Sequence, residues 1–311
     1  MLKKLIISAS ALALSACAFP TTTLAQEAPS GPALWVAQDE DTTIYLFGTV
    51  HVLPEGLDWL QPTVAEALAS SDQFVSEIDT SQIAQFDPAS GEAPSPEAME
   101  FIQLQMSLAT LQGEQSLREL MTDENRAEYE AAMADLELPV AAFDRFEPWF
   151  VSFVMMQQSM MRAGYDPNDG VEMVLDTMID GKERAALETV EQQLGFFDTM
   201  PIESQLDFLD AGIEGWNDFE NIDGVFQQMV TEWISGDAEG LAAILNEQMD
   251  DPIVYDIILS RRNEAWAGWI DDRMDQPGTV FIAVGAGHLA GEYTVQDFLA
   301  ERGIMTERVE Y

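Results

Sequence analysis

Two apolar, β-branched segments, one near each end of the chain, most constrain the fold. Residues 43–47 and 279–284 have the composition of buried strands. Pro62 is placed to begin a helix, and residues 74–78 have the pattern of the next strand. A strand, loop, helix and strand in this order are the usual start of a parallel sheet. We therefore expect one central sheet to which both ends of the chain contribute.

The middle of the chain is predicted to be mostly helical. The sequence favours an α/β fold, with a central mixed or mostly parallel sheet and a helical insertion at about 97–273. We expect residues 26–311 to form a single domain. The other predicted elements are strands at 33–36, 184–187 and 306–310, helices at 62–70, 169–180 and 293–302, and a surface loop at 80–97.

The first thirty residues have the layout of a secretory signal peptide. Lys3 and Lys4 precede an apolar run from about 5 to 19, which is too short to cross a bilayer as a helix. Small polar residues follow it. We therefore expect export, to the periplasm or the outer membrane of a bacterium.

Two cleavage sites are compatible with this leader. Removal of residues 1–25 would follow the small-residue sequence Thr-Leu-Ala, which ends at Ala25. Removal of residues 1–16 would follow a Leu-Ser-Ala-Cys sequence that resembles the bacterial lipobox and would leave a lipidated Cys17. Cys17 is the only cysteine, so no internal disulfide is expected, and the mature domain has no cysteine nucleophile.

The charge balance limits the classes of partner. The chain has 13 basic and 56 acidic residues, and 13 − 56 gives the net charge of −43. A nucleic-acid footprint needs clustered Lys and Arg, so we expect no nucleic-acid partner. Membrane association is expected only through a lipid on Cys17. So acidic a surface suits a saline medium, in which salt screens the repulsion between like charges.

The two histidines of the chain lie in the same local context. His51 and His288 each follow a predicted buried strand and stand three residues after a glycine, Gly48 and Gly285. In open α/β sheets, ligands bind beyond the carboxyl ends of the strands. Imidazole is a common metal ligand and transfers protons near neutral pH. We therefore expect both histidines to belong to one site, although each could be only a hydrogen-bonded turn residue.

Two glutamates are placed to complete such a site. Glu77 lies at the end of an apolar predicted strand, and Glu188 follows the short strand near 184–187. Either could be a metal ligand or a proton acceptor. With 56 acidic residues in the chain, position alone does not decide this.

One arginine is predicted to lie on an apolar helix face. Ile258, Arg262, Trp266 and Trp269 recur at spacings of four, four and three residues. A charged group on a packing face needs a partner. Arg262 could pair with a site carboxylate, bind an anionic group of a substrate, or form only a structural ion pair.

An ordered set of motifs resembles the TraB/GumN family, which includes the Tiki proteins. The resemblance covers roughly residues 33–310. Its motifs are Leu-Phe-Gly-Thr-Val-His at 46–51, Val-Ser-Glu-Ile-Asp at 75–79, Gly-Tyr-Asp at 164–166, Gly-Val-Glu at 170–172, Leu-Glu-Thr at 187–189, Arg262-Asn263 with Trp266, and Gly-Ala-Gly-His-Leu at 285–289. Glu172 stands where the family usually has an aspartate, which weakens the case for a role of this residue.

The resemblance implies an α/β fold of the erythromycin-esterase/ChaN-like type. For Tiki proteins it implies a protease that depends on a divalent metal. Carried over to this chain, the ligands are His51, Glu77 and His288, the ion is Mn, Co or Zn, and Glu188 or Glu77 accepts the proton of a metal-bound water. Arg262 would orient the substrate or stabilise negative charge. Gly48, Gly285, Asn263 and Trp266 are further candidates.

We therefore expect an exported metal-dependent hydrolase that acts on a peptide or a small molecule. Peptide hydrolysis is the first choice and ester hydrolysis the second. The sequence has no Gly-x-Ser-x-Gly elbow, His-Glu-x-x-His helix or phosphate-binding loop. The alternative is a periplasmic or surface protein that binds metal, haem or polysaccharide without turnover.

Overall fold

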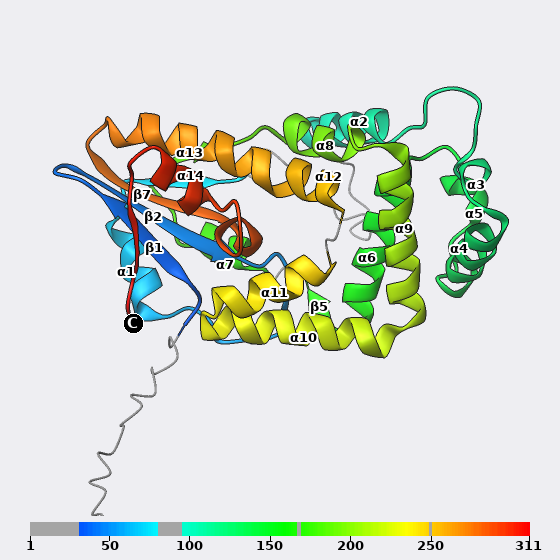
Figure 1. Ribbon diagram of the computed structural model, residues 1–311, viewed down its shortest axis with the longest axis horizontal. Helices are drawn as coiled ribbons and strands as arrows, with labels where there is room; N and C mark the ends of the chain where they lie inside the picture. Colours follow the sequence, from blue (N-terminus) through cyan, green and yellow to red (C-terminus); the bar gives the residue numbers. More distant parts are fainter. Residues whose placement is uncertain (1–30, 80–94, 167–168, 249–250) are drawn as a thin grey trace, which may run out of the picture.

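A six-stranded mixed sheet forms one half of the molecule, and helices form the other (Figure 1). The structure is a computed structural model that describes residues 31–79, 95–166, 169–248 and 251–311. The strands of the sheet are β1 (Leu34–Gln38), β2 (Thr42–Thr49), β4 (Gln73–Ser76), β6 (Glu183–Ala186), β7 (Gly278–Gly285) and β8 (Thr306–Arg308). The short strands β3 (Leu53–Pro54) and β5 (Tyr165–Asp166) form a separate pair.

The sheet joins both ends of the chain, as predicted. Its order is β6-β4-β7-β2-β1-β8, so β7 from the end of the chain lies between β2 and β4 from its beginning. Strands β6, β4, β7 and β2 are parallel, whereas β1 and β8 are antiparallel to their neighbours. Four strands therefore end at the same edge of the sheet.

The two central strands are apolar because both of their faces are covered. Phe47 and Phe281 pack on one face with Val64 and Leu68 of helix α1 (Pro62–Ser70). On the other face, alternate residues such as Ile282 pack against helices α13 (Arg261–Met274) and α14 (Val295–Glu301). These two layers thus hold β2 and β7 in the core.

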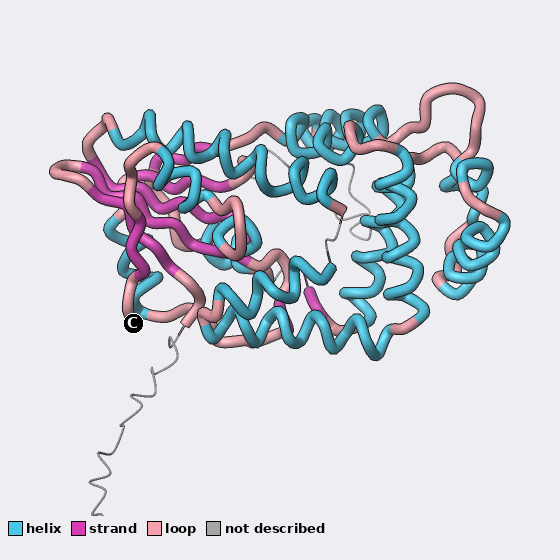
Figure 2. Tube along the Cα trace, in the orientation of Figure 1, coloured by secondary structure: helices cyan, strands magenta, loops and turns pink. Residues whose placement is uncertain are grey.

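Most of the remaining helices lie away from the sheet and build two further apolar clusters (Figure 2). Three of them instead contribute Val171, Trp233 and Leu241 to the cluster that packs on the sheet with Phe47 and Phe281. The bounds of the remaining helices are α2 (Pro96–Leu108), α3 (Leu117–Leu120), α4 (Asp123–Asp135), α5 (Val140–Phe143), α6 (Pro148–Arg162), α7 (Val171–Asp176), α8 (Val190–Asp198), α9 (Ile202–Asn217), α10 (Phe219–Ser235), α11 (Ala238–Gln248) and α12 (Pro252–Tyr255).

Several predicted bounds differ from the observed ones. The helix at 62–70 is confirmed, but the helix predicted at 169–180 is only α7, which ends at Asp176. The strand predicted at 74–78 ends at Ser76, and the edge strand predicted at 306–310 ends at Arg308. Most of the loop predicted at 80–97 lies outside the described residues.

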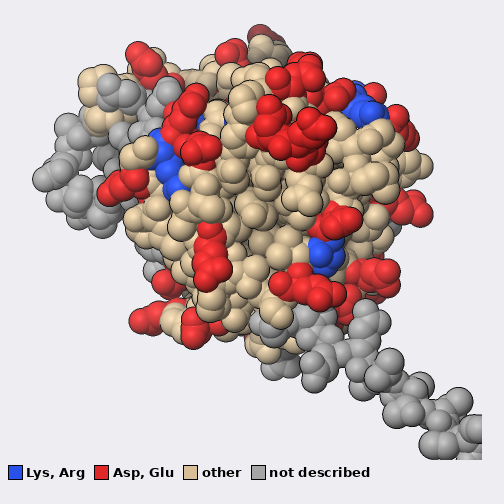
Figure 3. All heavy atoms as spheres, turned by 90° about the vertical axis from the view of Figure 1, so that its left-hand side faces the viewer, with Lys and Arg blue, Asp and Glu red and all other residues tan. Residues whose placement is uncertain are grey.

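Acidic side chains are spread widely over the face at the sheet end, with few Lys or Arg side chains among them (Figure 3). Within the described ranges, no helix is both long and apolar enough to cross a membrane. The predicted signal peptide and Cys17 lie outside these ranges.

Candidate functional site

The carboxyl edge of the sheet brings the candidate residues together. His51 follows β2, Glu77 follows β4 and Glu188 lies two residues after β6. His288 follows β7 within the short 3₁₀ helix η5 (Ala286–Leu289). The parallel order β6-β4-β7-β2 therefore places residues that are distant in the sequence at one edge.

Helix α13 lies over this edge and supplies three further candidates. Arg262, Asn263 and Trp266 are all buried. A π-helical turn, η4 (Asp256–Ser260), precedes α13, and such turns are frequent at functional sites. The predicted apolar face is thus present, and Arg262 lies within it.

Arg262 donates all five of its N–H groups within the protein. Its Nε and Nη2 contact the two Glu188 oxygens at 2.8 and 2.9 Å, and Nη2 also contacts Glu77 Oε2 at 2.6 Å. Nη1 donates to the Ile258 carbonyl at 3.1 Å and lies 3.2 Å from His288 Nε2. This geometry favours the pairing role over direct contact with a substrate, since a guanidinium has five donors.

His288 is buried and neutral. Its Nε2 faces an Arg262 donor and must therefore accept, so Nδ1 carries the proton and donates to Asn263 Oδ1 at 2.6 Å. Burial, aided by the charge of Arg262, outweighs the opposing charge of Glu77 and lowers the pKa of His288 to about 3. Trp266 covers the ring at a centroid distance of 4.3 Å and donates through Nε1 to Glu188.

Glu77 joins this buried group to a pocket. Its Oε1 accepts from the Gly285 N–H at 2.7 Å, and its Oε2 accepts from Gln193 Nε2 at 2.8 Å. Burial would raise the pKa of Glu77, but the positive charge of Arg262 and the hydrogen bond from the Gly285 N–H outweigh it and hold the pKa well below the usual carboxyl value. We call Arg262, Glu77, Glu188 and His288 the buried cluster.

His51 has a different environment. Its side chain is 73% exposed, and its Nδ1 contacts Glu172 Oε1 at 2.8 Å. Thr49 Oγ1 donates to the same carboxylate oxygen at 2.6 Å. The negative charge of Glu172 raises the pKa of His51 to about 9. We call His51 and Glu172 the outer pair.

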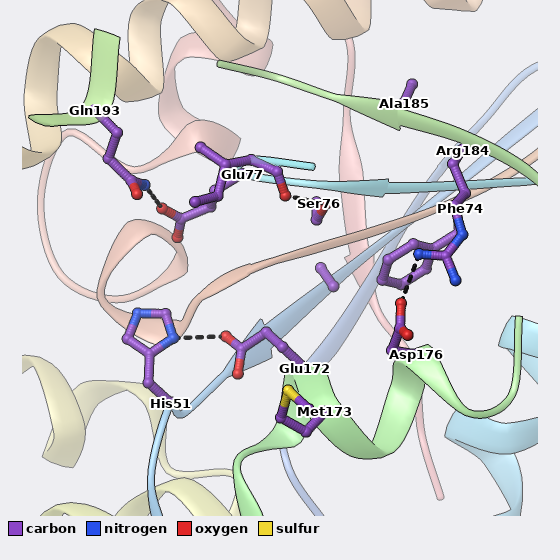
Figure 4. Close-up of a pocket in the computed structure, with 12 residues that line it drawn as sticks. His51, Phe74, Ser76, Glu77, Glu172, Met173, Asp176, Arg184, Ala185 and Gln193 are labelled. Atoms are coloured by element: carbon purple, nitrogen blue, oxygen red, sulfur yellow. Dashed lines mark hydrogen bonds and ion pairs between the residues drawn. The ribbon is translucent and has the colours of Figure 1, made fainter. Parts of the chain in front are cut away.

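The outer pair and Glu77 line one pocket of about 260 Å³. Figure 4 shows the His51 ring and the Glu77 carboxylate on opposite sides of this space, with Glu172 beside His51 and Gln193 beside Glu77. Because Glu172 engages Nδ1, Nε2 is the nitrogen of His51 that remains for a ligand. Asp176 and Arg184 pair at 2.6 Å in the wall of the pocket.

Two of the three predicted metal ligands lie close together, with His288 Nε2 3.8 Å from Glu77 Oε1, whereas His51 pairs with Glu172. Among the described residues, no three His, Cys, Asp or Glu side chains are placed to hold a metal ion. The physical reason lies in their partners, since Glu172 binds His51, and the Arg262 guanidinium contacts both Glu77 and His288 Nε2. The donor set therefore does not fit the Mn, Co or Zn ion that the resemblance implied.

The two glycines of the Gly-x-x-His motifs allow close approaches. A Cβ on Gly48 would lie 3.1 Å from the Ala286 Cβ, and one on Gly285 would lie 3.2 Å from Glu77 Oε1. The Gly48 carbonyl also accepts from Trp233 Nε1 at 2.8 Å. These glycines thus let β2 pack on η5 and let Glu77 reach the backbone of β7.

Sequence reasoning missed three residues of the site. Glu172 was discounted because an aspartate is usual there, yet it is the partner of His51. Thr49 and Gln193 hold the carboxylates of Glu172 and Glu77. The available signal was the Gly-Val-Glu motif at 170–172, which places Glu172 in the first turn of α7.

Comparison with known proteins finds one family and relatives of unassigned activity. A model of the TraB/PrgY/gumN family matches residues 33–308. An uncharacterized protein of Treponema pallidum (strain Nichols) is 21% identical over 282 residues, which cover 87% of this chain and 81% of that protein. The uncharacterized protein YbaP of Escherichia coli (strain K12) is 21% identical over 270 residues, which cover 86% of this chain and 92% of that protein. No solved structure matches the chain.

Proposed function

The chain belongs to the TraB/PrgY/gumN family, and from its site geometry we propose that it is a hydrolase of peptides, with esters as the second substrate class. The observation that carries the proposal is the outer pair. In it, a histidine faces a pocket through Nε2 and is held through Nδ1 by a carboxylate. A base that is oriented by a third group is the common arrangement for activating a nucleophile.

In the proposed reaction, His51 moves the protons. Nε2 of neutral His51 takes a proton from a water molecule in the pocket, and the water oxygen attacks the substrate carbonyl carbon. The bond from this carbon to the leaving nitrogen or oxygen then breaks. His51 returns the proton to the leaving atom, which gives an acid and an amine or an alcohol.

In this proposal, Glu77 positions the attacking water from the side of the pocket opposite His51. Its carboxylate is ionised, since its pKa lies well below the usual carboxyl value. It can therefore accept a hydrogen bond from the attacking water and hold it opposite His51. The other members of the buried cluster act as positioning residues, because Arg262 and Glu188 satisfy each other and do not line the pocket.

The divalent ion that the resemblance implied does not fit the side chains as they are paired here, so no step of this reaction uses one. The proposed mechanism depends instead on the proton transfer by His51 and on the fixed charge of Glu77. A binding protein without turnover, the alternative drawn from the sequence, would use the same pocket but would not need a proton-transfer group.

The test is hydrolysis of chromogenic peptide and ester substrates by the wild-type chain and by two variants. We expect His51→Ala to abolish turnover and Glu172→Gln to reduce it, while both retain the wild-type unfolding midpoint. Arg261→Ala is the matched control, because Arg261 is exposed and pairs with Asp256 at the surface. Equal turnover in wild type and His51→Ala would refute the proposal.

We also propose export, to the periplasm or as an outer-membrane lipoprotein. The layout of residues 1–25 supports it. The mass of the mature N-terminus distinguishes the two routes, since lipidation requires Cys17. Cys17→Ala should then release the chain from the membrane fraction, whereas cleavage after Ala25 leaves its location unchanged.

A further inference from the structure

We propose that an apolar cavity between helices α6, α8, α9, α11 and α12 is the subsite for a bulky apolar group of the substrate. The preferred class is then a peptide or ester with an aromatic or long aliphatic side chain next to the cleaved carbonyl. The inference rests on the proposed hydrolysis and adds the specificity of that same site.

The cavity has a volume of about 350 Å³. Voids larger than a water molecule are few in close-packed protein interiors, and a volume of this size is typical of small-molecule pockets. Its walls are mostly apolar and include Phe153, Phe197, Phe208, Val254 and Ile258. The phenyl rings pack edge to face. The ring centroid of Phe153 lies 4.6 Å from that of Phe197 and 6.1 Å from that of Phe208.

Helix α9 presents one continuous face to this cavity. Ser204, Asp207, Phe208 and Ala211 all line it, and their spacing of three, four and seven residues defines one side of a helix. Asp207 and Asp251 add negative charge to the wall, and the Ser204 hydroxyl binds Asp251. An acidic substrate side chain is therefore disfavoured, whereas an apolar one is accepted.

Two elements connect the cavity to the buried cluster. On α8, Gln193 binds Glu77, and Phe197 lines the cavity one helical turn later. On η4, Ile258 lines the cavity, and its carbonyl accepts from Arg262 Nη1 at 3.1 Å. The cavity thus begins one turn away from the groups that hold Glu77.

A second connection leads to the outer pair. Phe153 also lines a neighbouring cavity of about 240 Å³, together with Val52, which directly follows His51. Met156 and Met160 form part of the same wall. Because methionine side chains adapt to varied apolar shapes, this wall can accept apolar groups of different length beside Phe153.

The experiment narrows the cavity without touching the proposed catalytic groups. Ala211 is exposed and lines the cavity, so Ala211→Phe places a ring in its mouth. Ala131→Phe is the matched control, because Ala131 is an exposed residue of α4 that does not line this cavity. The substrates are peptide p-nitroanilides that differ only in an Ala, Leu, Phe or Glu side chain next to the cleaved bond.

We expect the wild-type kcat/KM to be at least about tenfold higher for Phe and Leu than for Ala, and lowest for Glu, since each added methylene in an apolar pocket gives roughly tenfold or more. Ala211→Phe should lower the preference for Phe about tenfold through KM and leave the Ala substrate unchanged. Ala131→Phe should match wild type for all four.

The outcomes separate this inference from the proposed function. No hydrolysis of any substrate by the wild type would overturn both. Hydrolysis with the same preference in wild type and Ala211→Phe would overturn the subsite alone. Fluorescence of the neutral probe N-phenyl-1-naphthylamine with the full chain gives a second measurement, and its affinity should fall in Ala211→Phe but not in Ala131→Phe.

Discussion

The two histidines share a motif but have opposite environments. Each is the last residue of a Gly-x-x-His sequence at the carboxyl end of a buried strand. His51 is exposed, and Glu172 raises its pKa to about 9, whereas burial lowers the pKa of His288 to about 3. The shared motif therefore fixes where each histidine lies along the sheet edge, and the partners contributed by other elements fix what each one can do.

Because their environments differ, the two histidines are suited to different roles in the site. His51 has a nitrogen that faces the pocket, while both nitrogens of His288 are occupied by Arg262 and Asn263. The outer pair is thus suited to chemistry, and the buried cluster is suited to holding Glu77. Each prediction below tests one side of this division.

The largest expected effect is on turnover in His51→Ala. We expect kcat/KM to fall by about 10²–10⁴, which is the usual contribution of general acid–base catalysis. The side chain is 73% exposed, so solvent screens its pair with Glu172, and the free energy of unfolding should fall by no more than about 1 kcal/mol. Steady-state kinetics and urea unfolding of the same preparation check both parts. A loss of stability that matched the loss of activity would contradict the division.

The next effect is on stability in Arg262→Ala. The change leaves the carboxylates of Glu77 and Glu188 buried without their cation, and breaking a buried pair in this way costs about 3–5 kcal/mol. The adjacent Arg261→Ala is the control, and since its pair is exposed, it should cost less than about 1 kcal/mol. Urea unfolding measures both. Similar costs for the two variants would show that the buried cluster is not a stabilising unit.

The sequence predicts much of the fold and the position of the site, for local reasons. Segments 43–47 and 279–284 are apolar because both faces are covered, and this pattern predicts their place in the sheet. The apolar stripe around Arg262 likewise predicts that this charge needs a partner. In each case a local pattern reports burial directly.

The side-chain partners could not be predicted, because they come from distant elements. Glu172 lies 123 residues from Thr49, with which it shares a hydrogen bond, and Arg262 lies 185 residues from Glu77. No periodicity reports such a contact. The metal triad was therefore a reasonable expectation from the carboxyl edge, but the strand ends do not reveal that Glu172 holds His51 or that a guanidinium contacts both Glu77 and His288.

A third test uses the pH dependence of the outer pair. The base form of His51 is the neutral one, and Glu172 raises its pKa to about 9, so kcat/KM should rise with pH up to about 9. Glu172→Gln removes the charge that raises this pKa. The rising limb of the pH profile of kcat/KM should therefore move toward the ordinary histidine pKa of about 6.5. The maximum kcat/KM should also be lower, because Nδ1 of His51 loses its charged partner. Rates between pH 5 and 10 decide this, and an unmoved limb would exclude His51 as the titrating group.

The smallest expected effect is that of a chelator, and it tests the buried cluster most directly. A metal ion on His288 would lie about 2 Å from Nε2, where Arg262 Nη1 already stands at 3.2 Å and competes for the same lone pair. A divalent ion and a guanidinium about 4 Å apart repel by about 8 kcal/mol at an effective dielectric constant of 20. We therefore expect kcat/KM to change by less than about twofold after treatment with EDTA, and elemental analysis to find much less than one ion per chain. Rapid loss of activity with EDTA, restored by Mn²⁺, would instead require Arg262 to leave His288. Both histidines would then have the same role.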